Sequence, residues 1–184
     1  MKNIILALGT LLIVSLAACK HNKVSTISPM THDSMTVEGV DSTIYGVCGE
    51  STGMSVMQLI TDNGDTLEIV VGATEDKDVV KGGIFVGDKM AVTAYKTDEG
   101  WVATQIINMS SLIGKWTSID KNFEIEEGGQ VKSYIKAESN PWTSWKIYNG
   151  HLLLNKDTFD IEELGSDSIY IENSMGIYTF KRQK

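Results

Sequence analysis

The sequence predicts an all-β chain that contains two barrels, one of five strands followed by one of eight. From residue 37 onward, apolar and polar residues alternate with a period of two, as expected for half-buried strands. These runs are short and rich in Val, Ile, Thr and aromatic residues, and clusters of Asn, Asp, Ser and Gly separate them. The pattern therefore favours consecutive hairpins over helices.

The first barrel is expected between residues 37 and 111. Its strand candidates are Thr43–Glu50, Met54–Thr61, Thr66–Val71, Lys89–Lys96 and Trp101–Asn108. Asn63-Gly64 favours a tight hairpin between the second and third strands, because this dipeptide tolerates positive φ. Residues 73–80 could form two helical turns with Thr74 as the N-cap. Five strands with a short helix at this place predict an OB-fold, and an SH3-like barrel is the main alternative.

The second barrel is expected over residues 112–184. Its strand candidates are Leu112–Ser118, Asn122–Glu126, Gln130–Ile135, Trp142–Asn149, His151–Asn155, Thr158–Leu164, Ser168–Glu172 and Gly176–Arg182. Consecutive antiparallel strands favour a closed up-and-down barrel, because closure removes exposed sheet edges. The strands span five to eight residues, so side chains alone can fill the interior, and a roomy cavity is not expected.

An ordered set of motifs runs through this second region. Gly114 and Trp116 form a Gly-x-Trp motif on the first strand, and Arg182, the only arginine of the chain, ends the last strand. Between them lie Phe-x-Ile before a Gly turn and Trp-Lys-Ile-x-x-Gly-x-Leu-x-Leu. In these motifs residues 112–184 resemble the bacterial lipocalin-like (calycin) lipoproteins. The resemblance implies that Arg182 packs across Trp116 and closes one end of the barrel, which is a favourable cation–π contact.

The first nineteen residues have the layout of a bacterial export signal. Lys2 supplies a positive charge, residues 4–16 form an apolar run too short to span a bilayer, and Leu16-Ala17-Ala18-Cys19 follows. These last four residues resemble a lipobox, which implies that residues 1–18 are removed and that Cys19 carries the lipid. An ordinary cleaved signal is the alternative. Lys20 stands where an Asp would favour retention in the inner membrane, so an outer-membrane anchor is expected. No acidic cluster that would favour display on the outer face follows Cys19, so the protein is expected to face the periplasm.

Residues 19–36 are rich in Ser and Thr and show no periodicity, so a flexible tether is expected between the anchor and the barrels. The charge of the two barrels differs. Residues 37–111 contain four lysines and twelve acidic residues, whereas residues 112–184 contain nine basic and eleven acidic residues. An acidic first barrel repels phosphate, and the second has no basic stripe, so nucleic acid is not an expected partner.

The sequence contains little that supports catalysis, and it implies no cofactor. The three histidines fall in the tether or in a turn, so no nucleophile has an evident histidine partner. Cys48 lies in an apolar run without basic neighbours and is expected to be buried and inert. Glu124, Glu126, Asp160 and Glu162 alternate with apolar residues, which predicts the solvated face of two strands.

Trp142 and Tyr148 are the candidate contacts for a ligand or a protein partner. Strand alternation places Trp145 and Ile147 in the core and directs Trp142 and Tyr148 to the opposite face, near the barrel rim. Exposed indoles stack on sugars and on apolar partners. The alternative, favoured by the short link between the barrels, is that Trp142 covers the barrel end or packs against the first barrel.

The tether offers one further candidate site. Met30, His32 and Met35 provide thioether and imidazole ligands of the kind that suit copper, although such residues also occur in linkers by chance. The sequence as a whole predicts a lipid-anchored, non-catalytic envelope protein that binds a small apolar ligand, a glycan or an envelope protein. Envelope-stress or copper sensing is the alternative function.

Overall fold

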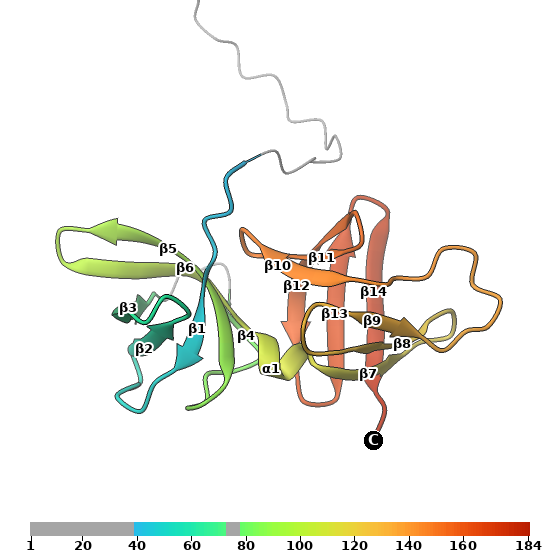
Figure 1. The fold of residues 1–184 in the computed structure, drawn as a ribbon, viewed down its shortest axis with the longest axis horizontal. Coiled ribbons are helices and arrows are strands. Elements are labelled where there is room, and N and C mark those ends of the chain that lie inside the picture. Colours follow the sequence, from blue (N-terminus) through green and yellow to red (C-terminus); the bar gives the residue numbers. More distant parts are fainter. Residues whose placement is uncertain (1–38, 73–77) are drawn as a thin grey trace, which may run out of the picture. The chain divides into compact units, whose positions relative to one another are not determined.

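The computed structural model of the protein describes residues 39–72 and 78–184 (Figure 1). All of these residues belong to one compact unit. They form fourteen strands and one short helix, so the predicted all-β class is confirmed. The signal segment, Cys19, the tether and its Met30, His32 and Met35 lie outside the described residues.

The first sheet contains a closed barrel of five strands. Its members, with one additional short strand, are β1 (Ile44–Cys48), β2 (Val56–Thr61), β3 (Thr66–Val71), β4 (Val80–Lys81), β5 (Lys89–Thr97) and β6 (Gly100–Asn108). β1 pairs with β2 and β5, β2 pairs with β3, and β5 pairs with β6. A parallel pairing of β3 with β6 completes the circle, which is the connectivity of the predicted OB-like barrel.

The predicted helix at residues 73–80 is wrong in its described part. Residues 73–77, including the candidate cap Thr74, lie outside the described residues. Asp78 and Val79 are not helical, and Val80 begins β4, which pairs in parallel with β6. Val79 is 6% exposed and belongs to the core of the first barrel. Two consecutive β-branched residues beside a sheet edge gain more from pairing than from a helical turn.

A short helix that the sequence analysis did not predict connects the two sheets. α1 (Met109–Leu112) begins at Asn108, whose side chain accepts a hydrogen bond from the Ser111 N–H at 2.9 Å. The Asn108 amide also donates to the Gly83 carbonyl at 3.1 Å and to the Asp88 carboxylate at 2.7 Å. Asn108 is fully buried, and these bonds satisfy its polar groups. The cap therefore fixes the point at which the second sheet begins.

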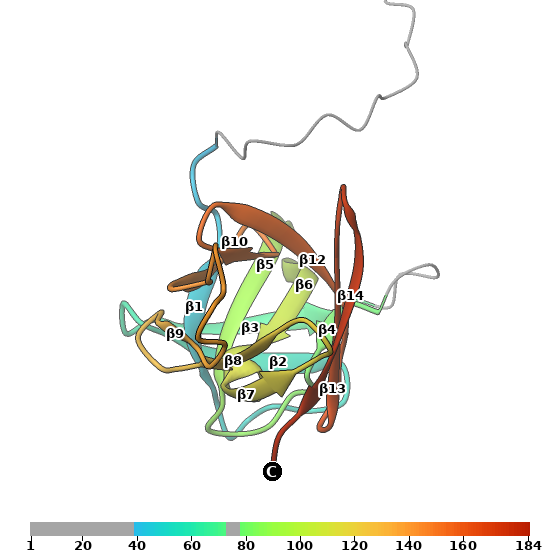
Figure 2. The same cartoon turned by 90° about the vertical axis from the view of Figure 1, so that its right-hand side faces the viewer.

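The second sheet is a nearly closed barrel of eight antiparallel strands. They are β7 (Gly114–Thr117), β8 (Asn122–Ile125), β9 (Val131–Ser133), β10 (Trp145–Tyr148), β11 (His151–Leu154), β12 (Asp157–Leu164), β13 (Ser168–Asn173) and β14 (Gly176–Arg182). Figure 2 shows β13 and β14 side by side, as their pairing requires. β14 pairs with β7, and a bridge between Gln130 and Ser144 joins the remaining edges near β9 and β10. The predicted eight-stranded barrel is confirmed.

Side chains fill the interior of the second barrel. Its largest fully buried members include Trp116, Phe180, Ile125, Ile147 and Leu152. The core also contains an aromatic chain in which the Phe123 ring meets the Phe180 and Trp142 rings edge to face, each pair with centroids 5.1 Å apart. Concave space is therefore confined to the ends of the barrel.

Candidate functional site at the open end of the eight-stranded barrel

One end of the eight-stranded barrel is closed by the motif residues. The Arg182 guanidinium carbon lies 4.1 Å from the centroid of the Trp116 ring, and Trp116 donates its indole N–H to the Leu112 carbonyl at 2.9 Å. Arg182 also donates to the carbonyls of Ile113 and Ser166, both at 2.8 Å. The structure thus brings Trp116 and Arg182 together across the first and last strands. We refer to this end as the closed end.

Gly114 makes room for this arrangement. Its φ is +136°, a conformation that residues with a side chain rarely adopt. A Cβ at this position would collide with a guanidinium nitrogen of Arg182. The glycine of the Gly-x-Trp motif is therefore needed both for its backbone conformation and for the space that Arg182 occupies.

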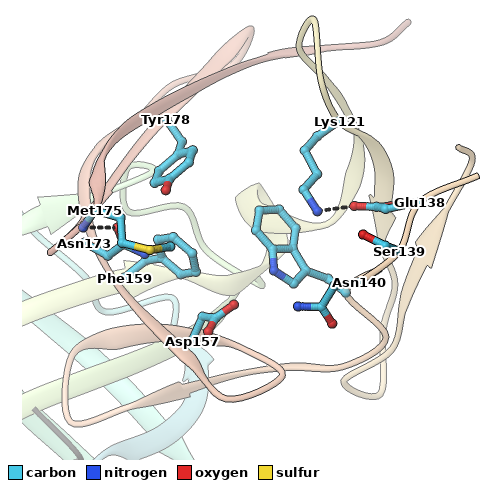
Figure 3. A pocket seen from close by; sticks show the side chains of 10 residues that line it. Lys121, Glu138, Ser139, Asn140, Asp157, Phe159, Asn173, Met175 and Tyr178 are labelled. Atoms are coloured by element: carbon cyan, nitrogen blue, oxygen red, sulfur yellow. Dashed lines mark hydrogen bonds and ion pairs between the residues drawn. The ribbon is translucent and has the colours of Figure 1, made fainter. Parts of the chain in front are cut away.

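The opposite end of the barrel contains a pocket of about 230 Å³. We call it the open-end pocket. Its residues come from the turns between β7 and β8, β9 and β10, β11 and β12, and β13 and β14, and from the strands next to them. They are Lys121, Glu138, Ser139, Asn140, Trp142, Asp157, Phe159, Asn173, Met175 and Tyr178 (Figure 3).

Aromatic rings form the inner wall of the open-end pocket. The Phe159 ring meets the Trp142 and Tyr178 rings edge to face, with centroids 5.8 Å apart in both pairs. Phe159 and Trp142 are buried, whereas Tyr178 is half-buried and Met175 on the adjoining turn is 79% exposed. The pocket therefore has an apolar base that continues outward to an exposed apolar tip.

An ion pair crosses the rim of the pocket. Lys121 pairs with Glu138, and the Lys121 ammonium nitrogen lies 4.3 Å from the centroid of the Trp142 ring. Glu138 also accepts a hydrogen bond from the Ser133 hydroxyl at 2.5 Å. Burial by itself would raise the pKa of the Glu138 carboxyl, but the bonds from Lys121 and Ser133 and the lysine charge outweigh it, and the pKa is lowered. Glu138 thereby attaches the loop at residues 134–144 to the barrel.

Because the pKa of Glu138 is lower in the folded chain, its ionised form stabilises the fold at neutral pH, and this stabilisation is lost as the pH falls through the folded-state pKa. We expect Glu138→Gln to have a lower Tm than the wild type at pH 7, and we expect this gap to shrink as the pH is lowered from about 4. Thermal unfolding over this pH series measures the gap. Glu163→Gln, an exposed glutamate on β12, is the control and should show no such pH-dependent gap. A constant gap for Glu138→Gln would contradict the ion-pair account.

The orientation that strand alternation predicts for Trp142 is wrong, and the structure agrees with the alternative that Trp142 covers the barrel end. Trp142 is 6% exposed and Trp145 is 9% exposed, so both indoles are directed into the barrel core. The reason is that β10 begins only at Trp145, so strand alternation does not extend to Trp142, which follows Pro141 in a loop. Trp142 nevertheless forms part of the wall of the open-end pocket, although neighbouring side chains cover most of its surface.

The structure does not bring Trp142 and Tyr148 together. Tyr148 lies at the far end of β10, next to the turn at Asn149 and Gly150, and it donates its hydroxyl to the Gly39 carbonyl. The Lys146 ammonium nitrogen lies 4.3 Å from the centroid of its ring. The residues that sequence reasoning missed are Asp157, Phe159 and Tyr178, which line the pocket with Trp142.

The cysteine and the four acidic residues for which no catalytic role was expected have the following surroundings. Cys48 is 1% exposed, with its sulfur 3.3 Å from the Thr52 hydroxyl oxygen. Glu126 pairs with Lys132, and Asp160 lies 2.6 Å from Nδ1 of His151. Glu124 accepts a hydrogen bond from Tyr134, and Glu162 is exposed. Within residues 39–72 and 78–184, no three His, Cys, Asp or Glu side chains are arranged to hold a metal ion.

A second hollow, of about 300 Å³, has an apolar lining that includes Tyr45, Met109, Ile113 and Trp145. Most of its polar side chains already have partners, and Lys89 pairs with Glu127. The Tyr45 hydroxyl donates to the Ile147 carbonyl at 2.5 Å, and the Trp145 indole donates to the Glu126 carbonyl at 2.7 Å. This hollow presents few groups that could select a ligand, so the open-end pocket is the better candidate site.

No family model matches the chain, and no curated protein or solved structure is significantly similar to it. In the part of the chain that the structure describes, no helix combines the length and the apolar character needed to cross a bilayer.

Proposed function

We propose that this protein is a lipid-anchored, non-catalytic binding protein of the bacterial envelope. The observation that carries the proposal is the asymmetry of the eight-stranded barrel, whose closed end is blocked by Trp116 and Arg182 and whose open end holds an aromatic-lined pocket. The resemblance of this barrel to the lipocalin-like lipoproteins and the lipobox-like Leu16–Cys19 segment support an anchored binding role.

The pocket is suited to binding a ligand at the barrel mouth and not to enclosing one inside the barrel. Small-molecule sites are usually concave, mostly apolar, and supplied with a few convergent polar groups. The open-end pocket has such a composition, whereas the barrel interior beneath it is filled with side chains. We therefore infer that the ligand stays at the mouth and does not enter the barrel.

The anchor has its own test. Because a thioether-linked lipid needs the cysteine sulfur, Cys19→Ala is expected to move the protein from the membrane fraction to the soluble fraction. Immunoblotting of the two fractions measures the shift, and Cys48→Ala, which removes the buried thiol, is the control that should stay on the membrane. Retention of Cys19→Ala in the membrane fraction would contradict the lipoprotein assignment.

The binding site is tested by adding the small-molecule fraction of a bacterial envelope extract to ¹⁵N-labelled protein purified from membranes in detergent. We expect amide shifts to change in the four turns around the open-end pocket and to stay constant near the closed end. Changes confined to the closed end or to the five-stranded barrel would contradict this location.

Copper or stress sensing is the alternative. It depends on Met30, His32 and Met35, which lie outside the described residues, and it stays a prediction of the sequence.

A further inference from the structure

The polar groups of the open-end pocket favour one class of ligand. Among the described residues, no hydrogen bond or ion pair occupies the Asp157 carboxylate, the Asn140 amide or the Tyr178 hydroxyl. The Asn173 side-chain oxygen accepts a hydrogen bond from the Met175 N–H at 2.9 Å, which leaves its NH₂ group available. Figure 3 shows Tyr178 across the pocket from Asp157 and Asn140.

These groups combine acceptors and donors within one small space. A carboxylate only accepts, an NH₂ group only donates, and a tyrosine hydroxyl does both. A ligand that satisfies them must supply both donors and acceptors, and neighbouring hydroxyls meet this need because each hydroxyl does both. A purely apolar ligand would bury Asp157 and Asn140 without partners, and this desolvation would cost binding energy.

The charges of the pocket disfavour an anion. Lys121 is the only basic residue of the pocket, and it is already paired with Glu138, while Asp157 adds a second negative charge. An anionic ligand would therefore meet net repulsion. A quaternary ammonium ion is held best between several aromatic faces, but the Lys121 ammonium group already lies over the Trp142 ring, which leaves Tyr178 as the accessible ring.

The aromatic wall and the volume of the pocket favour a single sugar ring. Tyr178 and Met175 give the pocket an accessible apolar side, against which the C–H face of a sugar ring can pack. The volume of about 230 Å³ is smaller than that of a pocket for a drug-sized molecule, so it suits one ring and not a long chain. Resting on the function proposed above, we propose that the open-end pocket binds a single neutral pyranose unit, such as the end of a glycan.

The test uses the full protein, purified from membranes in detergent, and saturation-transfer NMR with single-ring probes. The probes are the methyl pyranosides of glucose, galactose, mannose and N-acetylglucosamine, with choline and octanoate as representatives of the other ligand classes. We expect at least one pyranoside to bind and choline and octanoate not to bind. Failure of all four pyranosides would overturn the proposal.

A matched pair of variants locates the sugar. Asp157→Ala removes an exposed acceptor at the start of β12 and is expected to weaken pyranoside binding by about tenfold or more, as expected for loss of a hydrogen bond to a charged group. Asp160→Ala removes an exposed carboxylate of the same strand outside the pocket and should bind as the wild type does. Equal affinity of both variants would overturn the assignment of this pocket to the sugar.

The outcomes also separate this inference from the proposed function. If choline or octanoate binds at the open-end turns and no pyranoside does, the proposed binding function is supported and the pyranose proposal is overturned. Absence of every ligand from the open end, including those of the envelope extract, would overturn both.

Discussion

Replacing Trp116 with alanine is expected to lower the free energy of unfolding by about 3–5 kcal/mol. Trp116 is fully buried, its ring supports the Arg182 guanidinium, and its N–H satisfies the Leu112 carbonyl. Removing the indole leaves a cavity at the closed end and deprives two polar groups of their partner. Urea denaturation followed by circular dichroism measures the loss.

Trp101→Ala is the control for this prediction. Trp101 lies on β6 of the five-stranded barrel, is half-buried, and has the Lys96 ammonium nitrogen 5.9 Å from its ring centroid. The loss for Trp101→Ala should be clearly smaller, because less apolar surface returns to water and a smaller cavity forms. Equal losses, or a loss near zero for Trp116→Ala, would show that the closed end does not hold the barrel together.

Gly46→Val is expected to destabilise the five-stranded barrel by at least about 3 kcal/mol or to prevent folding. Gly46 is buried on β1 opposite Thr61 of β2. A Cβ at Gly46 would overlap the carbonyl oxygen of Ile60 and lie 2.9 Å from the Thr61 Cα. These are backbone atoms of a paired strand, so they cannot rotate away as a side chain would. Soluble yield and Tm measure the effect.

Gly53→Val provides the matched comparison. No heavy atom lies within 4 Å of a Cβ built at Gly53, so the added methyl groups meet open space. We expect a change within about 0.5 kcal/mol, which is usual for surface substitutions. A severe effect at Gly53, or a mild one at Gly46, would contradict the close approach of β1 and β2.

The strands of both barrels could be predicted because their signal is local. Alternation and turn residues place β3 and β14 at the bounds that the structure shows, and the Asn63-Gly64 turn lies between β2 and β3 as expected. The contact between Trp116 and Arg182 was implied by the resemblance to the lipocalin-like lipoproteins. The pairing of β14 with β7 brings the two residues together.

The open-end pocket could not be predicted in the same way. Its residues come from four turns that are far apart in the sequence, and only barrel closure brings Lys121, Asp157 and Tyr178 to one place. The orientation of Trp142 was missed because Pro141 precedes it and β10 starts three residues later, so alternation gave the wrong face. The helix α1 depends on the cap at Asn108, whose other partners, Gly83 and Asp88, are also distant in sequence.

Native mass spectrometry of the full lipidated protein, released gently from bacterial membranes, tests the binding role most directly. We expect a small additional mass that leaves on denaturation and that is reduced in Asp157→Ala but kept in Asp160→Ala. A ligand-free mass in all three proteins, unchanged after the envelope small-molecule fraction is added back, would contradict the binding role.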